Sequence, residues 1–411
     1  MTPKAYMDEK DNKIKDYLIM SGDIKVAEWR DRELKVINDR LLPLYLKRVS
    51  DADRWLETRA IDSHRANSRL LKKALRLAER DDVSTVIYAH GATITDNYWI
   101  KSPEEELSYR DVRFDNSYFA RLALTGDYDS FNKAAARCCG KTAGSGNYED
   151  TAGRSRLSAD SRYAKPVSAD TRYAKSSSRA DSESGDNRYI KTPELTNTGS
   201  FEKCWKLIGG KWYMYKQAKH DELFSELFAY ELGKQLGMNM ALYERGNGYI
   251  KTLDFTNDAS VNFEPAAAFM GDNEDYEDVL KALGSLCPDA IPDYIRMIFL
   301  DTLIANPDRH TNNFGLLRDN ISGKLIGPAP NFDNNMALIA RGYPSMPGRS
   351  DVLIRLFREV IEAHPEYCSL IPQVSTEHVS KCIDNVHMRV RKSYITELIM
   401  RRYELITQNY Q

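Results

Sequence analysis

The sequence predicts an α+β fold in which a strand-containing lobe is followed by a helical lobe, with a small N-terminal accessory domain in front of both. Three observations predict it. A stretch at 141–190 differs in composition from the rest of the chain and divides it. Behind this stretch, the strand-like segments 211–217 and 249–255 surround one helical pattern at 221–236. From residue 292 onward the pattern is mainly helical.

The accessory domain, residues 1–140, begins with a predicted hairpin. The segments 17–20 and 26–29 flank the turn residues Ser21-Gly22-Asp23. This part shows no constellation of catalytic residues. Further expected elements are helices at 51–59 and 67–80 and short strands at 85–88 and 97–100.

The segment 141–190 is predicted to be a low-complexity, disordered linker. Between residues 140 and 189 the only branched aliphatic residues are Leu157 and Val167, too few to form a core. Ser158-Ala-Asp-Ser-Arg-Tyr-Ala-Lys is followed by a near copy that starts at Ser168. Hydroxyls beside arginines make the segment a plausible phosphorylation target, and an inert spacer is the equal alternative. The catalytic domain is expected over 191–411, with helices at 292–305, 352–363 and 375–406.

Composition excludes several classes of protein. The 411 residues are 42% hydrophobic and 29% charged, with a formal net charge of -2, so no global attraction to nucleic acid or to an anionic membrane is expected. The six cysteines form no C-x-x-C pair, which favours reduced thiols. The start lacks an apolar signal core, and no stretch is long enough to span a bilayer. We therefore expect a soluble, cytoplasmic protein.

The strongest motif is Asn306-Pro-Asp308-Arg309-His310-Thr-Asn-Asn313, directly after a predicted helix. Phosphoryl transfer needs a carboxylate that orients and deprotonates the attacking hydroxyl, together with oxygen ligands for Mg²⁺. Asp308 fits the first task, and Asn313 can offer a neutral oxygen to the metal. A polar turn with satisfied asparagines accounts for Asn-Pro-Asp alone, but not for the whole motif.

A second motif, Phe332-Asp333-Asn-Asn, follows further along the chain. Asp333 is the second carboxylate that a Mg²⁺-nucleotide site requires. An isolated Asp in such a turn is usually structural. Because Asp333 occurs together with the preceding motif, we interpret it as a functional residue instead.

Together these segments resemble the catalytic and metal motifs of HipA-like kinases, a bacterial protein-kinase family. The Asp-Arg-His order is also similar to that of phosphoinositide kinases. The resemblance covers roughly residue 195 to the C-terminus and implies a two-lobed protein-kinase-like domain that uses ATP and Mg²⁺. It implies that Asp308 is the catalytic base, that His310 supports the loop, and that Asn313 and Asp333 hold Mg²⁺. Arg309 receives no role.

Upstream of these motifs, the segment 198–203 is a candidate phosphate loop containing Gly199, Ser200 and Lys203. Small residues before a strand let backbone N–H groups approach phosphates, and the family's loop has a similar Gly-small-x-x-Lys form. An ordinary hairpin turn is the alternative. In the strand 211–217, Lys216 is placed like the kinase lysine that grips the α- and β-phosphates, and a snorkelling lysine is the alternative.

Two glutamates complete the predicted nucleotide site. Glu226 lies on an inward face of the helix 221–236 and is expected to hold the ammonium of Lys216, with Glu231 as second candidate and a solvent-exposed glutamate as alternative. Glu264 lies in a segment expected to form the hinge between the lobes, where adenine would bond to backbone groups near 263–266.

The resemblance implies phosphorylation of serine or threonine in a protein, including the chain itself, and a regulatory or antitoxin-like partner. Autophosphorylation is expected at Ser200, with the linker serines Ser158 and Ser168 as competing sites and Thr196 and Thr198 as alternative hydroxyls. It also implies that residues 1–140 correspond to a small subdomain over the catalytic core, although their helices and the long linker depart from the toxin pattern. Two other functions stay open: a kinase for a lipid or small-molecule hydroxyl, and a non-catalytic nucleotide- or partner-binding module. The lack of a basic amphipathic helix and of net positive charge argues against a lipid substrate.

Overall fold

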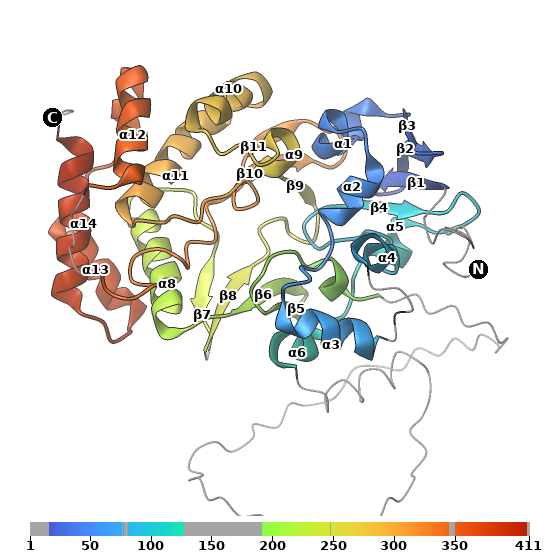
Figure 1. Ribbon diagram of the computed structural model, residues 1–411, viewed down its shortest axis with the longest axis horizontal. Coiled ribbons are helices and arrows are strands. Elements are labelled where there is room, and N and C mark those ends of the chain that lie inside the picture. Colours follow the sequence, from blue (N-terminus) through green and yellow to red (C-terminus); the bar gives the residue numbers. More distant parts are fainter. Residues whose placement is uncertain are drawn as a thin grey trace, which may run out of the picture.

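The computed structural model of this chain describes residues 16–75, 77, 81–126, 191–246, 248–344 and 350–408. The predicted linker at 141–190 lies outside these residues. The described residues form three antiparallel sheets surrounded by helices, in agreement with a mixed helix and sheet fold (Figure 1). The helices near the C-terminus lie at the end of the molecule opposite to the first sheet (Figure 1).

The N-terminal segment, which we define as residues 16–126, contains the first sheet, in the order β3-β2-β1-β4. The predicted hairpin is confirmed, because Ser21 pairs with Ile24 across the turn. Aromatic side chains such as Tyr17, Trp29 and Trp55 fill the core of this segment. Its elements are β1 (Asp16–Ser21), β2 (Ile24–Arg30), β3 (Glu33–Val36), η2 (Asp39–Leu41), α1 (Leu44–Arg48), α2 (Ala52–Glu57), α3 (Ala66–Ala74), α4 (Asp82–Ile87), β4 (Tyr98–Lys101), α5 (Tyr109–Val112) and α6 (Ala120–Thr125).

One predicted strand of this segment is wrong, since residues 85–88 belong to helix α4 and its C-cap. The Asp81 side chain accepts from the backbone N–H of Ser84 at 2.9 Å, which is the usual start of a helix. The β-branched run that suggested a strand is instead buried as part of α4. The helix predicted at 67–80 also ends earlier, at Ala74.

The second sheet has the order β5-β6-β8-β7 and lies beside helix α8 (His220–Gln235). Its strands are β5 (Lys203–Ile208), β6 (Lys211–Gln217), β7 (Tyr243–Arg245) and β8 (Tyr249–Leu253), preceded by η3 (Pro193–Thr196). Helix α8 is buried over most of its length, with Phe224, Phe228 and Leu232 in the largest core. The predicted strand at 211–217 is confirmed.

The third sheet, β11-β10-β9, is interleaved with the helical half of the chain, because α9, α10 and α11 lie between β9 and β10 in the sequence. The long helix predicted at 375–406 is two helices, because His387 takes a left-handed conformation with φ of 51° and ends α13. None of the helices that the structure describes is both long and apolar enough to cross a membrane. The elements are β9 (Val261–Pro265), α9 (Ala266–Met270), α10 (Tyr276–Leu286), η4 (Pro288–Ala290), α11 (Ile291–Leu303), β10 (Gly315–Asp319), β11 (Leu325–Pro328), α12 (Val352–Ala363), η5 (Pro365–Leu370), α13 (Thr376–Val386) and α14 (Lys392–Thr407).

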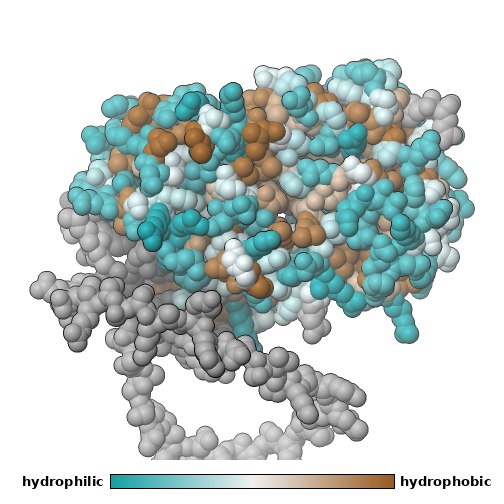
Figure 2. Space-filling view, turned by 180° about the vertical axis from the view of Figure 1, so that it is seen from behind, coloured by the Kyte–Doolittle hydropathy of each residue, from teal (hydrophilic) through white to brown (hydrophobic). Residues whose placement is uncertain are grey.

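On the face seen from behind, hydrophobic residues form several groups among hydrophilic ones (Figure 2). The more exposed apolar residues include Ile321, in the turn between β10 and β11, and Ile326, in β11. Single exposed apolar residues of this kind are normal for folded proteins.

A buried ion pair within the third sheet is hydrogen-bonded to the N-terminal segment. Arg318 Nη1 on β10 lies 3.0 Å from Glu264 Oε1 on β9, and both side chains are almost fully buried. The Tyr98 hydroxyl donates to Glu264 at 2.7 Å, and the Leu44 N–H donates to the same carboxylate at 3.3 Å. Arg318 also donates to the Leu42 carbonyl at 2.7 Å. The two parts of the chain therefore share one charged group in their interface.

Removal of the Glu264 carboxylate should strongly destabilise the protein. Glu264→Ala leaves the buried Arg318 without its counter-charge, which typically costs about 3–5 kcal/mol of unfolding free energy. Urea unfolding followed by circular dichroism measures the loss. Glu359→Ala is the control, because the exposed Arg355–Glu359 pair on α12 should contribute less than about 0.5 kcal/mol. Equal losses in the two variants would contradict this role of the buried pair.

Candidate functional site

A buried arginine stands at the centre of the candidate site. Arg309 Nε donates to Asp301 Oδ2 at 2.8 Å and Nη2 donates to Asp301 Oδ1 at 2.9 Å, a two-pronged ion pair with helix α11. Burial alone would lower the pKa of Arg309, but the Asp301 carboxylate raises it above its ordinary value. Asn306 Nδ2 donates to the same carboxylate at 2.8 Å. Arg309 is therefore a fixed, permanently charged group.

The rest of the Arg309 guanidinium ties two loops together. Nη1 donates to the Asn313 carbonyl at 2.8 Å and to the Phe332 carbonyl at 2.5 Å. Nη2 donates to Asn331 Oδ1 at 3.0 Å and to Asn334 Oδ1 at 2.7 Å. The two sequence motifs, far apart along the chain, thus meet at one side chain. We call Arg309 and these partners the Arg309 cluster.

In the loop of the first motif, residues 306–313, hydrogen bonds fix the backbone around Asp308 but do not use its carboxylate. The Asn313 amide nitrogen donates to the Asp308 carbonyl at 2.9 Å, and the Asp308 N–H donates to Asn306 Oδ1 at 3.2 Å. The His310 ring accepts from the Asn312 N–H at 3.3 Å, which supports the loop from within. To the residues that the structure describes, the half-buried Asp308 carboxylate makes no hydrogen bond or ion pair. It is free to accept a proton from a ligand.

In the loop of the second motif, residues 331–335, Asp333 faces the lysine of strand β6. Lys216 Nζ lies 2.5 Å from Asp333 Oδ1 and donates to Asn335 Oδ1 at 3.0 Å. Burial would raise the pKa of Asp333, but the nearby Lys216 ammonium outweighs it and holds the pKa below its ordinary value. Asp333 adopts φ of 62°, and its N–H donates to the Tyr243 hydroxyl at 2.9 Å. The structure thus brings together the two predicted residues Lys216 and Asp333.

Glu226 points inward as predicted, but its hydrogen bonds go to a different partner. Its carboxylate accepts from the Asn334 N–H at 2.9 Å and from the Asn334 side chain at 3.3 Å, and not from Lys216. Burial and the charge of Asp333 raise the pKa of Glu226 to about 7. The second candidate, Glu231, accepts from Asn385 on α13. Glu226 therefore fixes the loop that carries Asp333.

The candidate phosphate loop lies directly before β5. Gly199 has φ of 95°, and a Cβ there would lie 2.5 Å from Lys203 Nζ, so the position requires glycine. Burial and the neighbouring cations Arg65 and Lys216 lower the pKa of the Lys203 ammonium to about 7. Lys216 Nζ lies 4.3 Å from the centre of the Phe201 ring, and Ser200 is exposed. The positive groups of the loop and of β6 thus gather in one place.

The buried carboxylate of Glu194 holds this loop through hydrogen bonds. Glu194 in η3 is fully buried and accepts from the Trp205 N–H at 3.0 Å. It also accepts from the Asn197 side chain at 3.4 Å. Burial raises the pKa of Glu194 to about 7. Glu194 therefore links β5 to the start of the loop.

Glu264 is not brought to this cluster. Its carboxylate belongs to the ion pair with Arg318, so its contacts favour a structural role. Nearby backbone N–H groups are also engaged, since Phe263, Ala266 and Ala267 donate to the carbonyls of Thr95, Phe314 and Thr311. A contact between this segment and adenine stays a prediction.

The oxygen donors at 313 and 333 fit Mg²⁺. The amide nitrogen of Asn313 is used within the loop, which leaves its Oδ1 as the oxygen for a metal, and the lowered pKa of Asp333 keeps that carboxylate ionised. Arg309 Nη1 holds the backbone on both sides of this pair. Among the described residues no cluster of three or more His, Cys, Asp or Glu side chains could hold a metal. A nucleotide-bound Mg²⁺ needs only one or two carboxylates beside the phosphates.

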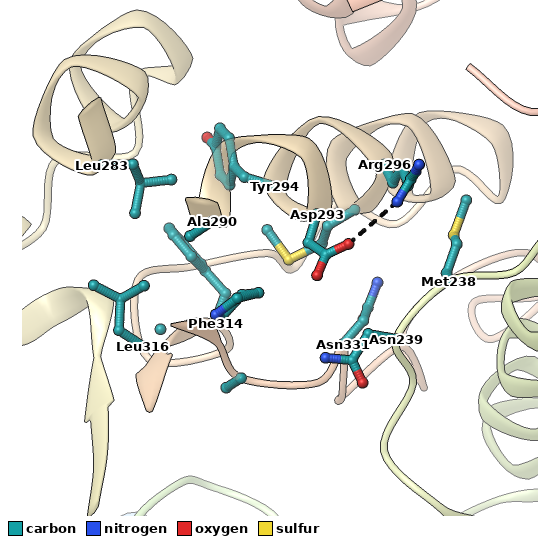
Figure 3. A pocket seen from close by; sticks show the side chains of 14 residues that line it. Met238, Asn239, Leu283, Ala290, Asp293, Tyr294, Arg296, Phe314, Leu316 and Asn331 are labelled. Atoms are coloured by element: carbon teal, nitrogen blue, oxygen red, sulfur yellow. Dashed lines mark hydrogen bonds and ion pairs between the residues drawn. The ribbon is translucent and has the colours of Figure 1, made fainter. Parts of the chain in front are cut away.

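A small cavity is lined by Asn331 of the Arg309 cluster (Figure 3). Its volume is about 30 Å³, room for only one or two water molecules. Asp293 and Arg296 on α11 lie across it from Asn331, with 3.5 Å between Asp293 Oδ1 and Arg296 Nη1. Asn331 lines it, and its amide nitrogen has no hydrogen-bond partner among the described residues. The cavity is too small for a nucleotide.

Sequence reasoning missed the residues that hold the site together. Arg309 received no role, and Asn334, Asn335 and Tyr243 were not singled out. One signal was present for Arg309, because Asp301 is a carboxylate within an otherwise apolar helical stretch. A buried carboxylate of that kind requires a cationic partner.

Comparisons with known proteins give structural matches only. No protein-family model matches the sequence, and no curated protein does. The chain is similar to the crystal structure of a Helicobacter pylori proinflammatory kinase, CtkA, with 19% identity over 49% of this chain and 89% of that chain and a TM-score of 0.39. It is also similar to a chain of the Shewanella oneidensis toxin–antitoxin complex of HipA, HipB and operator DNA, with 15% identity over 94% and 97% of the two chains and a TM-score of 0.44. HipA gives its name to the family that the sequence motifs resemble.

The raised pKa of Glu194 predicts a pH-dependent stability. Its ordinary pKa is 4.5 and its folded pKa is about 7, so between these values the folded protein binds a proton that the unfolded chain has released. The free energy of unfolding should therefore fall as pH rises through this window, by at most about 1.4 kcal/mol per pH unit for one proton. Glu194→Gln keeps an oxygen for the Trp205 N–H but lacks this proton.

Urea unfolding at several pH values between about 5 and 7 tests this expectation. The difference in stability between Glu194→Gln and the wild type should shift in favour of the variant as the pH rises. Glu359→Gln, at an exposed site, is the control and should follow the wild type. A difference that stays constant with pH would show that Glu194 does not retain its proton.

Proposed function

We propose that this chain is an ATP- and Mg²⁺-dependent kinase that transfers the γ-phosphate of ATP to a serine or threonine hydroxyl of a protein. One observation carries the proposal. Arg309 fixes the loop with the unengaged Asp308 carboxylate against the loop of Asp333, which faces the strand lysine Lys216. A base, a metal-binding carboxylate and a phosphate-binding lysine are the groups that this reaction needs.

Asp308 acts on the attacking hydroxyl. Its carboxylate accepts the proton of the serine or threonine hydroxyl as the oxygen bonds to the γ-phosphorus. The bond between the γ-phosphorus and the β–γ bridging oxygen breaks, and the electron pair leaves with ADP. His310 and Asn313 keep the loop in place, since each contacts the loop backbone.

The positive charges bind the phosphates of ATP. Lys216 pairs with Asp333 in the described state, and on nucleotide binding it would turn its ammonium to the α- and β-phosphates. Lys203 and the N–H groups of the phosphate loop contact the remaining phosphate oxygens. Asn313 and Asp333 would hold Mg²⁺, which neutralises developing negative charge on the transferred group. Glu226 keeps Asp333 in position through Asn334.

The acceptor is proposed to be a protein, and the chain itself is one candidate. Ser200 is exposed on the phosphate loop, where the resemblance to HipA-like kinases implies autophosphorylation. The same resemblance suggests a regulatory, antitoxin-like partner. A phosphoserine at 200 would carry about -1.5 to -2 charges and would repel the phosphates of a second ATP.

Asp308→Asn tests the proposed chemistry. The variant should bind ATP nearly as well as the wild type but lose about 10²–10⁴-fold in the rate of phosphate transfer, because it cannot accept the proton. The assay is incubation with γ-labelled ATP and Mg²⁺, followed by mass spectrometry of the chain and of a cell lysate, with ATP binding measured by calorimetry. Asp289→Asn, at an exposed position in η4, is the matched control.

Two results would contradict the proposal. Transfer by Asp308→Asn at the wild-type rate would remove Asp308 from the role of base. ATP binding by the wild type without transfer to any acceptor would instead favour the non-catalytic module. Labelled lipid in the lysate, with unlabelled protein, would favour the lipid kinase.

A further inference from the structure

The candidate phosphate loop rests on an arginine of the N-terminal segment. Arg65 directly precedes α3 and is only 2% exposed. Its Nε donates to the Gly199 carbonyl at 2.9 Å, and its Nη2 donates to the carbonyls of Thr198 at 3.1 Å and Gly199 at 2.8 Å. Nη2 also donates to the Asn197 carbonyl. One guanidinium thus binds three successive carbonyls of a segment far away along the chain.

Other hydrogen bonds also hold the loop against the N-terminal segment. The Asn67 N–H, in the first turn of α3, donates to Glu202 Oε1 at 2.9 Å, at the far end of the loop. The Thr196 hydroxyl donates to the Ala92 carbonyl at 2.6 Å, just before the loop. The loop is therefore anchored on the N-terminal segment at its start, its middle and its end.

Binding of these carbonyls sets the direction of the loop's N–H groups. The peptide units are trans, so the C=O and the N–H of one unit point in opposite directions. Because the carbonyls at 197, 198 and 199 point to Arg65, the N–H groups of Thr198, Gly199 and Ser200 are directed away from it. These N–H groups donate to no residue in the described part of the chain. Successive outward N–H groups of this kind form an anion-binding concavity.

The surroundings of the loop are cationic. Lys203 Nζ lies against Gly199, close enough that a Cβ there would clash with it. Lys216 Nζ lies over the Phe201 ring at 4.3 Å. Arg65 itself retains a buried Nη1 that has no hydrogen-bond partner among the described residues. Outward N–H groups and several cations together fit a polyphosphate.

We propose that Arg65 is a positioning residue for nucleotide phosphates, through which the N-terminal segment completes the phosphate loop. Arg65 binds the loop carbonyls and thereby presents the N–H groups of 198–200 to the phosphates of ATP. The proposal rests on the proposed function, in which this loop binds ATP. It assigns a role in nucleotide binding to a part of the chain in which the sequence showed no catalytic constellation.

Binding measurements with three probes test the proposal: ATP, adenosine and inorganic tripolyphosphate, each with Mg²⁺. Arg65→Ala should weaken the binding of ATP and of tripolyphosphate by about 10–100-fold, an effect of the size found when the residues that orient metal ligands are removed. Adenosine binding should stay unchanged. Arg65→Lys should give a smaller loss, because lysine keeps the charge but lacks the planar set of donors. Arg54→Ala is the matched control, an exposed arginine of the same segment.

The selective loss of phosphate-bearing probes distinguishes positioning from mere stability, because a general loosening of the fold would also weaken adenosine binding. Unchanged ATP and tripolyphosphate binding in both Arg65 variants would overturn the proposal. Failure of both variants to fold would also overturn it, since Arg65 would then be a core residue. If wild type binds tripolyphosphate in an Arg65-dependent way but transfers no phosphate from ATP, the proposed kinase function fails while this inference stands.

Discussion

The buried guanidinium of Arg309 is the constraint on which the candidate site depends. Its charge is compensated by Asp301 on α11, and its remaining donors bind both loops that carry the proposed catalytic and metal-binding residues. An unpaired charge at this depth would be very unfavourable, so the helix, the first loop and the second loop must come together for the cluster to form. The position of Asp308 relative to Asp333 is therefore set by the hydrogen-bond partners that the buried Arg309 guanidinium requires.

Other buried arginines in the described part of the chain also bind backbone carbonyls. Arg318 binds Glu264 and the carbonyls of Arg40 and Leu42, and Arg65 binds the carbonyls of the candidate phosphate loop. Arginine suits this role because its donors lie in one plane and it keeps its charge when buried. Arg318 and Arg65 thus connect the N-terminal segment to later parts of the chain. The N-terminal segment is attached by specific polar contacts in addition to apolar packing.

Sequence patterns predicted the residue types of the site better than their contacts. The loop motif, the Phe-Asp turn and the strand lysine could be found because their spacing is local, and the structure brings Lys216 to Asp333. The partner of Glu226 could not be predicted, because it depends on how α8 lies against the second loop. In the fold, the run at 85–88 looked like a strand by composition, whereas the Asp81 cap made it a helix. The left-handed turn at His387 likewise leaves no clear mark in a continuous helical pattern.

The contact between Arg65 and the loop also has a consequence for the order of folding. Arg65 leaves the ribosome more than a hundred residues before the carbonyls that it binds. Contacts between segments so distant along the chain form slowly, and domains tend to fold from the N-terminal end during synthesis. The N-terminal segment has thus already been synthesised when the loop emerges. The proposed nucleotide site is completed late in biosynthesis, because the residues that contact the loop are synthesised before the loop itself.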